Sequence, residues 1–264
     1  SEDVPIDGIS FSNAGAFFEQ LKVIVSNFNV VCVTCALCSL YFVVAGLQFW
    51  TTGYLVKVVG LAQQYSNIAF GICALTAPLM GVSVGGYLTD RLGGYKGENL
   101  LTAIKLCAAF GFIAVLFSFP CAFATYPAVF IPLLWTLLFN GACIIPTATG
   151  IIVDSVSREY QAASSSFSQL VFNIFGYYAS PTISAIVMDA IPDEEMGLTW
   201  GIRIVLMGSV FGLFYILLAW FHIARNIDRY IELQDEMDPR GHLLSRAEVQ
   251  VEIKKRRRAM SLLQ

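Results

Sequence analysis

The chain of 264 residues is 56% hydrophobic and only 13% charged, with a formal net charge of -3. A soluble domain of this size normally carries about a quarter charged residues. The apolar residues gather in repeated long stretches, which argues against a soluble domain and indicates an integral membrane protein. The first ten residues, SEDVPIDGIS, are acidic and polar, so the sequence does not predict a signal peptide there.

The apolar stretches predict one surface helix and six membrane spans. Residues 16–28 (AFFEQLKVIVSNF) have apolar residues at helical spacing, and we expect them to lie along the membrane surface. Crossing about 30 Å of hydrocarbon takes roughly 20 helical residues. The predicted fold class is all-α, because lipid offers no partner for an unpaired backbone group. The six predicted spans are 28–57, 65–89, 99–119, 128–153, 162–188 and 201–223.

The sequence divides into three predicted regions: 1–27 before the spans, the bundle 28–223, and a polar tail 224–264. Ser245 and Glu248 form a capping box that predicts a helix in the tail. Its basic run either binds anionic lipid headgroups, at roughly 1 kcal/mol per residue, or is solvated. A nucleic-acid partner is not expected for a tail joined to a membrane bundle. The basic run comprises Lys254, Lys255, Arg256, Arg257 and Arg258.

Basic residues orient the predicted bundle. Fourteen of the 16 Lys and Arg residues fall on the side that holds both termini and the loop after the second span. Lys57 and Arg203 fall on the other side, together with the acidic segment 189–195 (DAIPDEE). By the positive-inside rule, both termini are predicted to be cytoplasmic.

Polar side chains recur on one helical face of the first, fourth and fifth predicted spans. In the fifth span the stripe comprises Ser166, Gln169, Asn173, Tyr177, Ser180 and Ser184. Such residues are costly in lipid, so they either line a water-accessible cavity or hydrogen-bond between packed helices. Both interpretations stay open, with helix packing favoured for Ser and Thr. The candidate cavity residues are Tyr41, Gln48, Trp50, Thr136, Asn140, Thr147, Gln169, Asn173 and Tyr177.

Catalytic and metal chemistry is not predicted. No Asp or Glu falls at a mid-membrane position of the predicted spans, so the sequence shows no carboxylate relay for protons or sodium. Cys32, Cys35 and Cys38 are interpreted as small apolar filler, since an iron–sulfur run needs a fourth cysteine nearby. His222 and His242 lack metal-ligand spacing. We therefore expect no cofactor, no metal and no enzyme activity.

A charged stretch, GGYLTDRLGGYKG (85–97), joins the second and third predicted spans. Its residue order resembles the signature loop of the major facilitator superfamily of transporters, although Gly94 and Tyr95 stand where that family usually has basic residues. The resemblance implies a loop that takes part in conformational change and whose second-half copy packs against the first half. The matching loop residues are Gly86, Asp90, Arg91, Gly93 and Lys96.

The resemblance extends along the chain. Residues 154–181 look like the entry to the eleventh span of the family, where Asn173, Gly176 and Pro181 match an N-x-x-G…P pattern. Residues 41–55 look most like the seventh span of spinster-type transporters. The chain therefore resembles a C-terminal six-helix half bundle of the major facilitator fold, with spans seven to twelve.

The resemblance implies a secondary active transporter that moves a small organic or amphipathic solute, such as a lipid-derived one, by alternating access. Its expected partners are the bilayer, the solute and an N-terminal six-helix half, upstream in the same chain or on a separate polypeptide. A sugar or amino-acid carrier fits the same residues. The alternative is a scaffold or accessory subunit that kept the fold and lost transport, which the missing acidic relay favours and the polar stripes disfavour.

Overall fold

The computed structural model describes residues 12–95, 97 and 99–227. The predicted tail helix, the basic run 254–258 and Lys96 lie outside the described residues. The described part is helical, and six of its segments are long and apolar enough to cross a membrane, which confirms the predicted all-α fold with six spans. Its helices are α1 (Ser12–Ser26), α2 (Phe28–Lys57), α3 (Gln63–Arg91), α4 (Asn99–Cys121), α5 (Pro127–Asp154), η1 (Arg158–Tyr160), α6 (Gln161–Phe172), η2 (Asn173–Tyr178), α7 (Ala179–Asp189) and α8 (Glu194–Arg225).

Capping side chains explain where two of the helices begin. Asn27 separates α1 from α2, because its Oδ1 accepts hydrogen bonds from the backbone of Asn29 and Val30, the unpaired donors of a helix start. Its Nδ2 donates to the carbonyl of Ser155 at 2.6 Å, which ties this junction to the end of α5. At the start of α8, Asp193 accepts from the backbone of Met196 at 2.8 Å.

The fifth span is continuous but not regular, because α6 and α7 are joined by the π-helical turns of η2. Small residues at four-residue spacing form its buried face. In a regular helix a four-residue repeat drifts by about 40° per step. The π-helix has more residues per turn, so it keeps the repeat on one side. The buried small residues are Ser164, Ser168, Gly176, Ser180 and Ser184.

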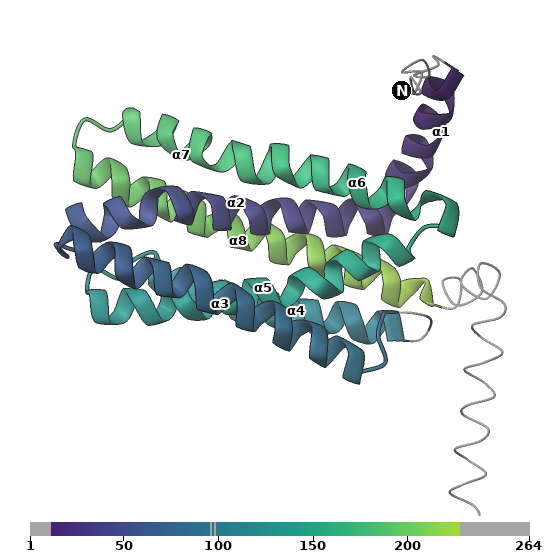
Figure 1. Cartoon of the computed structure of the whole chain (residues 1–264), viewed down its shortest axis with the longest axis horizontal. Coiled ribbons are helices and arrows are strands. Elements are labelled where there is room, and N and C mark those ends of the chain that lie inside the picture. The colour runs from purple at the N-terminus through teal and green to yellow at the C-terminus, as the bar shows by residue number, and fades with distance from the viewer. Residues whose placement is uncertain (1–11, 96, 98, 228–264) are drawn as a thin grey trace, which may run out of the picture.

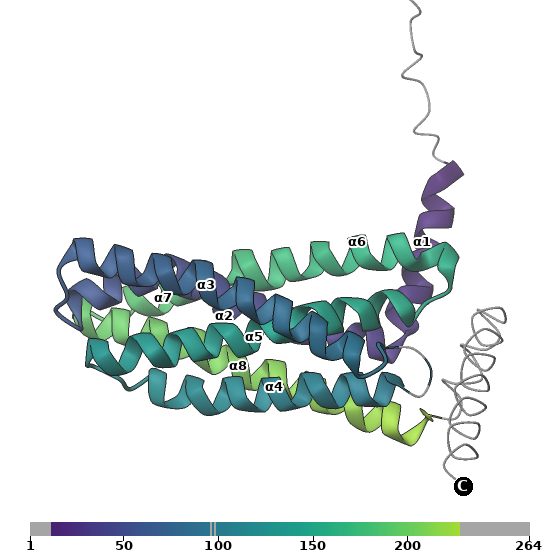
Figure 2. The ribbon, with the colours of Figure 1, turned by 60° about the horizontal axis from the view of Figure 1, so that its bottom comes forward.

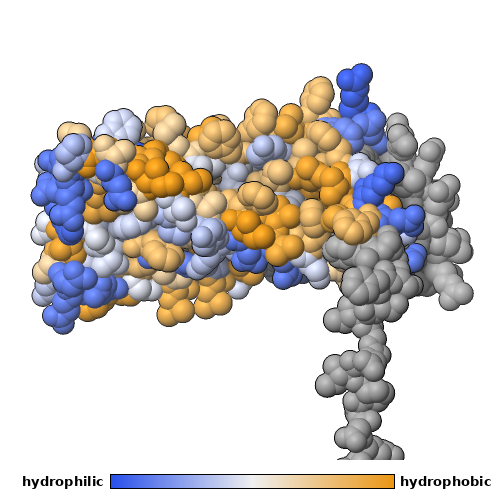
Figure 3. All heavy atoms as spheres, turned by 90° about the horizontal axis from the view of Figure 1, so that it is seen from above, coloured by the Kyte–Doolittle hydropathy of each residue, from blue (hydrophilic) through white to orange (hydrophobic). Residues whose placement is uncertain are grey.

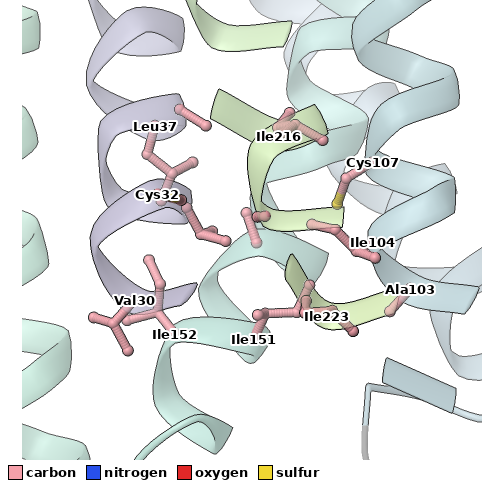
Figure 4. Close-up of a cluster of buried hydrophobic side chains, with 14 of the residues drawn as sticks. Val30, Cys32, Leu37, Ala103, Ile104, Cys107, Ile151, Ile152, Ile216 and Ile223 are labelled. Atoms are coloured by element: carbon pink, nitrogen blue, oxygen red, sulfur yellow. The ribbon is translucent and has the colours of Figure 1, made fainter. Parts of the chain in front are cut away.

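In the view of Figure 2, α3 and α6–α7 both lie toward one edge of the bundle and α4 lies along the opposite edge, with α2 and α5 between these edges. Figure 1 shows that α3 and α6–α7 are separated from each other, with α2 between them. Buried aliphatic side chains of α2, α4, α5 and α8 form a core near the end where α1 lies, as Figure 4 shows for Leu37, Ile104, Ile151 and Ile216. This core therefore holds α2, α4, α5 and α8 together.

Both ends of the described chain lie at the same end of the bundle: α1 begins there and α8 finishes there (Figure 1). Hydrophilic residues gather at the two ends, whereas the middle of the surface in Figure 3 is largely apolar, with paler polar residues between the apolar patches. At the end opposite α1, Lys57 forms an ion pair with Glu194, and both side chains are exposed. This distribution is the one expected of a bundle that spans a bilayer.

Candidate solute-binding face

The centre of the candidate site is a hydrogen-bonded pair on the surface of the bundle. The hydroxyl of Tyr177 in η2 donates to Oε1 of Gln48 in α2 at 2.5 Å, and both side chains are exposed. The two helices approach closely because Gly176 has no side chain: a Cβ there would lie 2.6 Å from the carbonyl oxygen of Cys38. The glycine next to Tyr177 thus lets η2 bring the phenol to α2.

Two further aromatic side chains of α2 are fixed by the fifth span. Nε1 of Trp50 donates to Oγ of Ser184 at 2.8 Å. Tyr41 stacks on Phe172, with ring centroids 4.4 Å apart and an angle of 6° between the planes. Phe172 is not among the residues predicted from the sequence, because an aromatic residue inside an apolar run carries no signal that separates it from the core. The two pairings join α2 to the fifth span before and after the Gln48–Tyr177 pair along both helices.

Gln169 and Asn173 are exposed and precede Tyr177 at the same four-residue spacing. Nδ2 of Asn173 donates to the carbonyl of Gln169 at 2.8 Å, and Nε2 of Gln169 donates to Oγ of Ser165 at 3.4 Å. Together with Gln48 and Tyr177 they offer hydrogen-bond donors and acceptors without a fixed charge. We name Gln48, Trp50, Gln169, Asn173 and Tyr177 the polar face.

The three candidates on α5 have different surroundings. Asn140 is buried, with Nδ2 donating to the carbonyl of Thr136 at 2.8 Å, and Oγ1 of Thr136 donates to the carbonyl of Pro132 at 2.9 Å. Thr147 is fully buried against α3, with Oγ1 2.5 Å from Oγ1 of Thr89. The structure therefore places Thr147 in helix packing and does not bring it to the polar face.

The edge formed by α3 and the fifth span is weakly buried within this chain. Of the most apolar stretch of each helix, 22% is buried in α3 and 17% in the fifth span, against 56% in α2. Large apolar side chains on this edge include Ile72, Leu75 and Leu79 of α3 and Phe175 of η2, all of them exposed. These residues form two exposed apolar patches, one on α3 and one on the fifth span, which lipid or a second helical bundle would cover.

The signature loop (residues 85–97) closes the end of α3. Gly93 has a φ of +98°, which favours glycine, and its carbonyl accepts from Nδ2 of Asn99 at 2.9 Å. The side chain of Arg91 donates to the hydroxyl of Tyr87 at 3.2 Å. The carboxylate of Asp90 is exposed and has no partner among the described residues.

The two glycines at the start of the loop differ in their contacts. A Cβ on Gly85 would lie 2.7 Å from Cα of Cys143, whereas one on Gly86 would lie 3.9 Å from Cβ of Pro146. Gly85, in contrast to Gly86, thus permits the close approach of α3 to α5. Within the described residues, no group of His, Cys, Asp and Glu could hold a metal ion.

Comparisons with known proteins identify the fold. The model of the Organic Anion Transporter Polypeptide (OATP) family matches residues 6–129. The crystal structure of a bacterial homolog of the human lysosomal transporter Spinster, inward-facing and unoccupied, resembles the chain with a TM-score of 0.60 and 14% identity. The match covers 86% of this chain and 54% of the other, so this chain spans about half the length of that transporter. A search of curated proteins found no match. The chain is an integral multi-pass membrane protein with the fold of one six-helix half of a major facilitator superfamily transporter.

Proposed function

We propose that the chain is the C-terminal half of a secondary active transporter, spans seven to twelve, and that it moves a small amphipathic organic anion by alternating access. An N-terminal six-helix half supplies the other wall of the site. The observation that carries the proposal is the polar face, in which the exposed Tyr177–Gln48 hydrogen bond lies among aromatic side chains of a membrane-spanning bundle.

The chemistry of the polar face suits an amphipathic solute. The amides of Gln48, Gln169 and Asn173 can donate to anionic or carbonyl oxygens, and the hydroxyl of Tyr177, which donates to Gln48, holds that amide in place. The rings of Trp50, Tyr41 and Phe172, held between the same two spans, suit an apolar body. The name of the matching family supports an anion as the charged part of the solute.

The arrangement of the helices supports alternating access. In transporters built from two related halves, one half rocks against the other around a site near the middle of the membrane. The apolar edge of α3 and the fifth span is the surface against which the other half would rock, and the signature loop lies at the end of that edge. We place both termini and this loop in the cytoplasm, because the basic residues of the chain gather on their side.

The test is flux of a fluorescent amphipathic organic anion into vesicles that contain the intact protein. Tyr177→Phe removes the hydroxyl that bonds to Gln48 and keeps the ring. Tyr178→Phe is the matched control, because Tyr178 is exposed and its hydroxyl has no partner among the described residues. Losing a hydrogen bond costs about 1 kcal/mol, so we expect KM to rise about fivefold for Tyr177→Phe and to stay unchanged for Tyr178→Phe.

Two outcomes would contradict the proposal in different ways. If the intact protein moves no amphipathic anion, the transport assignment fails and the scaffold alternative takes its place. If it does transport but Tyr177→Phe and Tyr178→Phe behave alike, the solute does not bind at the polar face.

A further inference from the structure

A second site lies on the opposite side of the bundle, at the end away from α1. A groove of about 90 Å³ runs between α4 and α8. Trp200, Arg203, Met207 and Val210 line one wall, at spacings that put them on one face of α8. Phe119 and Phe123 lie on the α4 side. We name this the α4–α8 groove.

Arg203 is held in a defined position in this groove. Its Nε donates to the carbonyl of Ala122 at 3.3 Å, just beyond the last residue of α4. Its guanidinium carbon lies 4.9 Å from the ring centroid of Phe123 and 5.1 Å from that of Trp200. These contacts fix the guanidinium, while its two terminal nitrogens have no hydrogen-bond acceptor among the described residues. In the described part of the chain, no carboxylate pairs with Arg203, in contrast to Lys57, which pairs with Glu194.

The walls of the groove are exposed on the outside of the bundle. Phe119, Phe123, Trp200 and Met207 are between 45% and 60% exposed, and α4 lies on the edge of the bundle opposite α3 and α6–α7 (Figure 2). Arg203 is level with the end of α4, where aromatic side chains are typical of the boundary between hydrocarbon and headgroups. At this boundary the guanidinium can reach the headgroups of the lipids.

We propose that the α4–α8 groove binds the headgroup of an anionic phospholipid from the leaflet at the end opposite α1. The guanidinium presents parallel N–H donors that match the geometry of a phosphate. The acyl chains would lie along the exposed apolar side chains of Met207 and Val210. The charge of Arg203 and its exposed aromatic neighbours favour an anionic lipid over a soluble phosphate compound.

The test uses the fluorescence of Trp200 as a reporter of lipid in the groove. The intact protein is placed in vesicles that contain brominated phosphatidylglycerol or brominated phosphatidylcholine, because bromine quenches nearby tryptophan. The part of the signal that Trp200→Phe removes belongs to Trp200. We expect brominated phosphatidylglycerol to quench this part at a mole fraction about fivefold lower than brominated phosphatidylcholine.

Substitutions identify the residue responsible for the preference. Arg203→Gln should abolish it, and Arg203→Lys should keep part of it because the charge remains. Lys57→Gln is the matched control, since it removes a positive charge at the same end from a residue that is already ion-paired. Equal quenching by the two lipids in the unsubstituted protein, or an unchanged preference in a folded Arg203→Gln variant, would overturn the proposal. Neither measurement depends on transport.

Discussion

Replacing Gly85 by alanine should weaken the packing of α3 against α5. A Cβ at this position would lie 2.7 Å from Cα and 2.8 Å from the carbonyl carbon of Cys143. Both are backbone atoms, so relief cannot come from a change of rotamer and the helices must move apart. The first distance falls about 0.7 Å short of the 3.4 Å at which ordinary contact begins.

The separation would also disturb the neighbouring contacts between the same helices. One turn earlier, Gly81 is equally close to α5, since a Cβ on Gly81 would lie 2.7 Å from Cβ of Ala142. One turn later, the buried hydroxyls of Thr89 and Thr147 form the hydrogen bond that joins α3 to α5. Overpacking of this kind costs about 1–3 kcal/mol.

The adjacent glycine provides the matched control. A Cβ on Gly86 would lie 3.9 Å from Cβ of Pro146, an ordinary contact. Both substitutions gain the same helix propensity, so the difference between the two variants isolates the steric effect. We expect Gly85→Ala to lower the free energy of unfolding by about 2 kcal/mol relative to Gly86→Ala. Circular dichroism during unfolding by dodecyl sulfate in mixed micelles measures this difference, and equal stabilities would refute the reasoning.

Two further substitutions test the loop and the α4–α8 contact. Asp90→Ala should slow transport several-fold while leaving the equilibrium affinity for the solute unchanged, because Asp90 is exposed at the end of α3 and lies outside the polar face; an unchanged transport rate would remove its conformational role. Ser118→Ala should destabilise the bundle by about 1 kcal/mol, because the buried hydroxyl of Ser118 donates to the carbonyl of Leu206 in α8 at 2.8 Å. Ser83→Ala is the control for unfolding in micelles, because Ser83 is exposed and its hydroxyl donates within its own helix. A larger loss of stability in Ser83→Ala than in Ser118→Ala would contradict a stabilising role for the Ser118–Leu206 hydrogen bond.

The bounds of the spans could be predicted because bilayer thickness sets the length of an apolar run. The first span, predicted as 28–57, is α2 (Phe28–Lys57), and the fourth, predicted as 128–153, is α5 (Pro127–Asp154). The surface helix, predicted as 16–28, ends two residues earlier, because Asn27 caps α2 and cannot also continue α1. Its position at a membrane surface stays a prediction.

The surroundings of the polar residues could be predicted only in part. Thr147 shares a helical face with Asn140, yet the close approach of α3 buries it against Thr89. Whether a threonine lines a cavity or joins two helices depends on which neighbour comes close. Gly81 and Gly85 of α3 lie close to α5, but spacing within one helix does not identify which neighbouring helix comes close.

The surroundings of the polar stripe in the fifth span could also be predicted only in part, and the difference bears on function. Regular helical spacing predicts one face from Ser166 to Ser184, but the π-helix η2 divides the stripe. Ser180 and Ser184 turn into the bundle, whereas Tyr177 stays on the surface with Gln48. Hydrocarbon would leave the remaining amide donors of Gln48 without partners, at a cost of several kcal/mol. The exposure of this pair in the middle of a spanning segment therefore favours a surface that meets water and protein, which is what a second six-helix half would create around it.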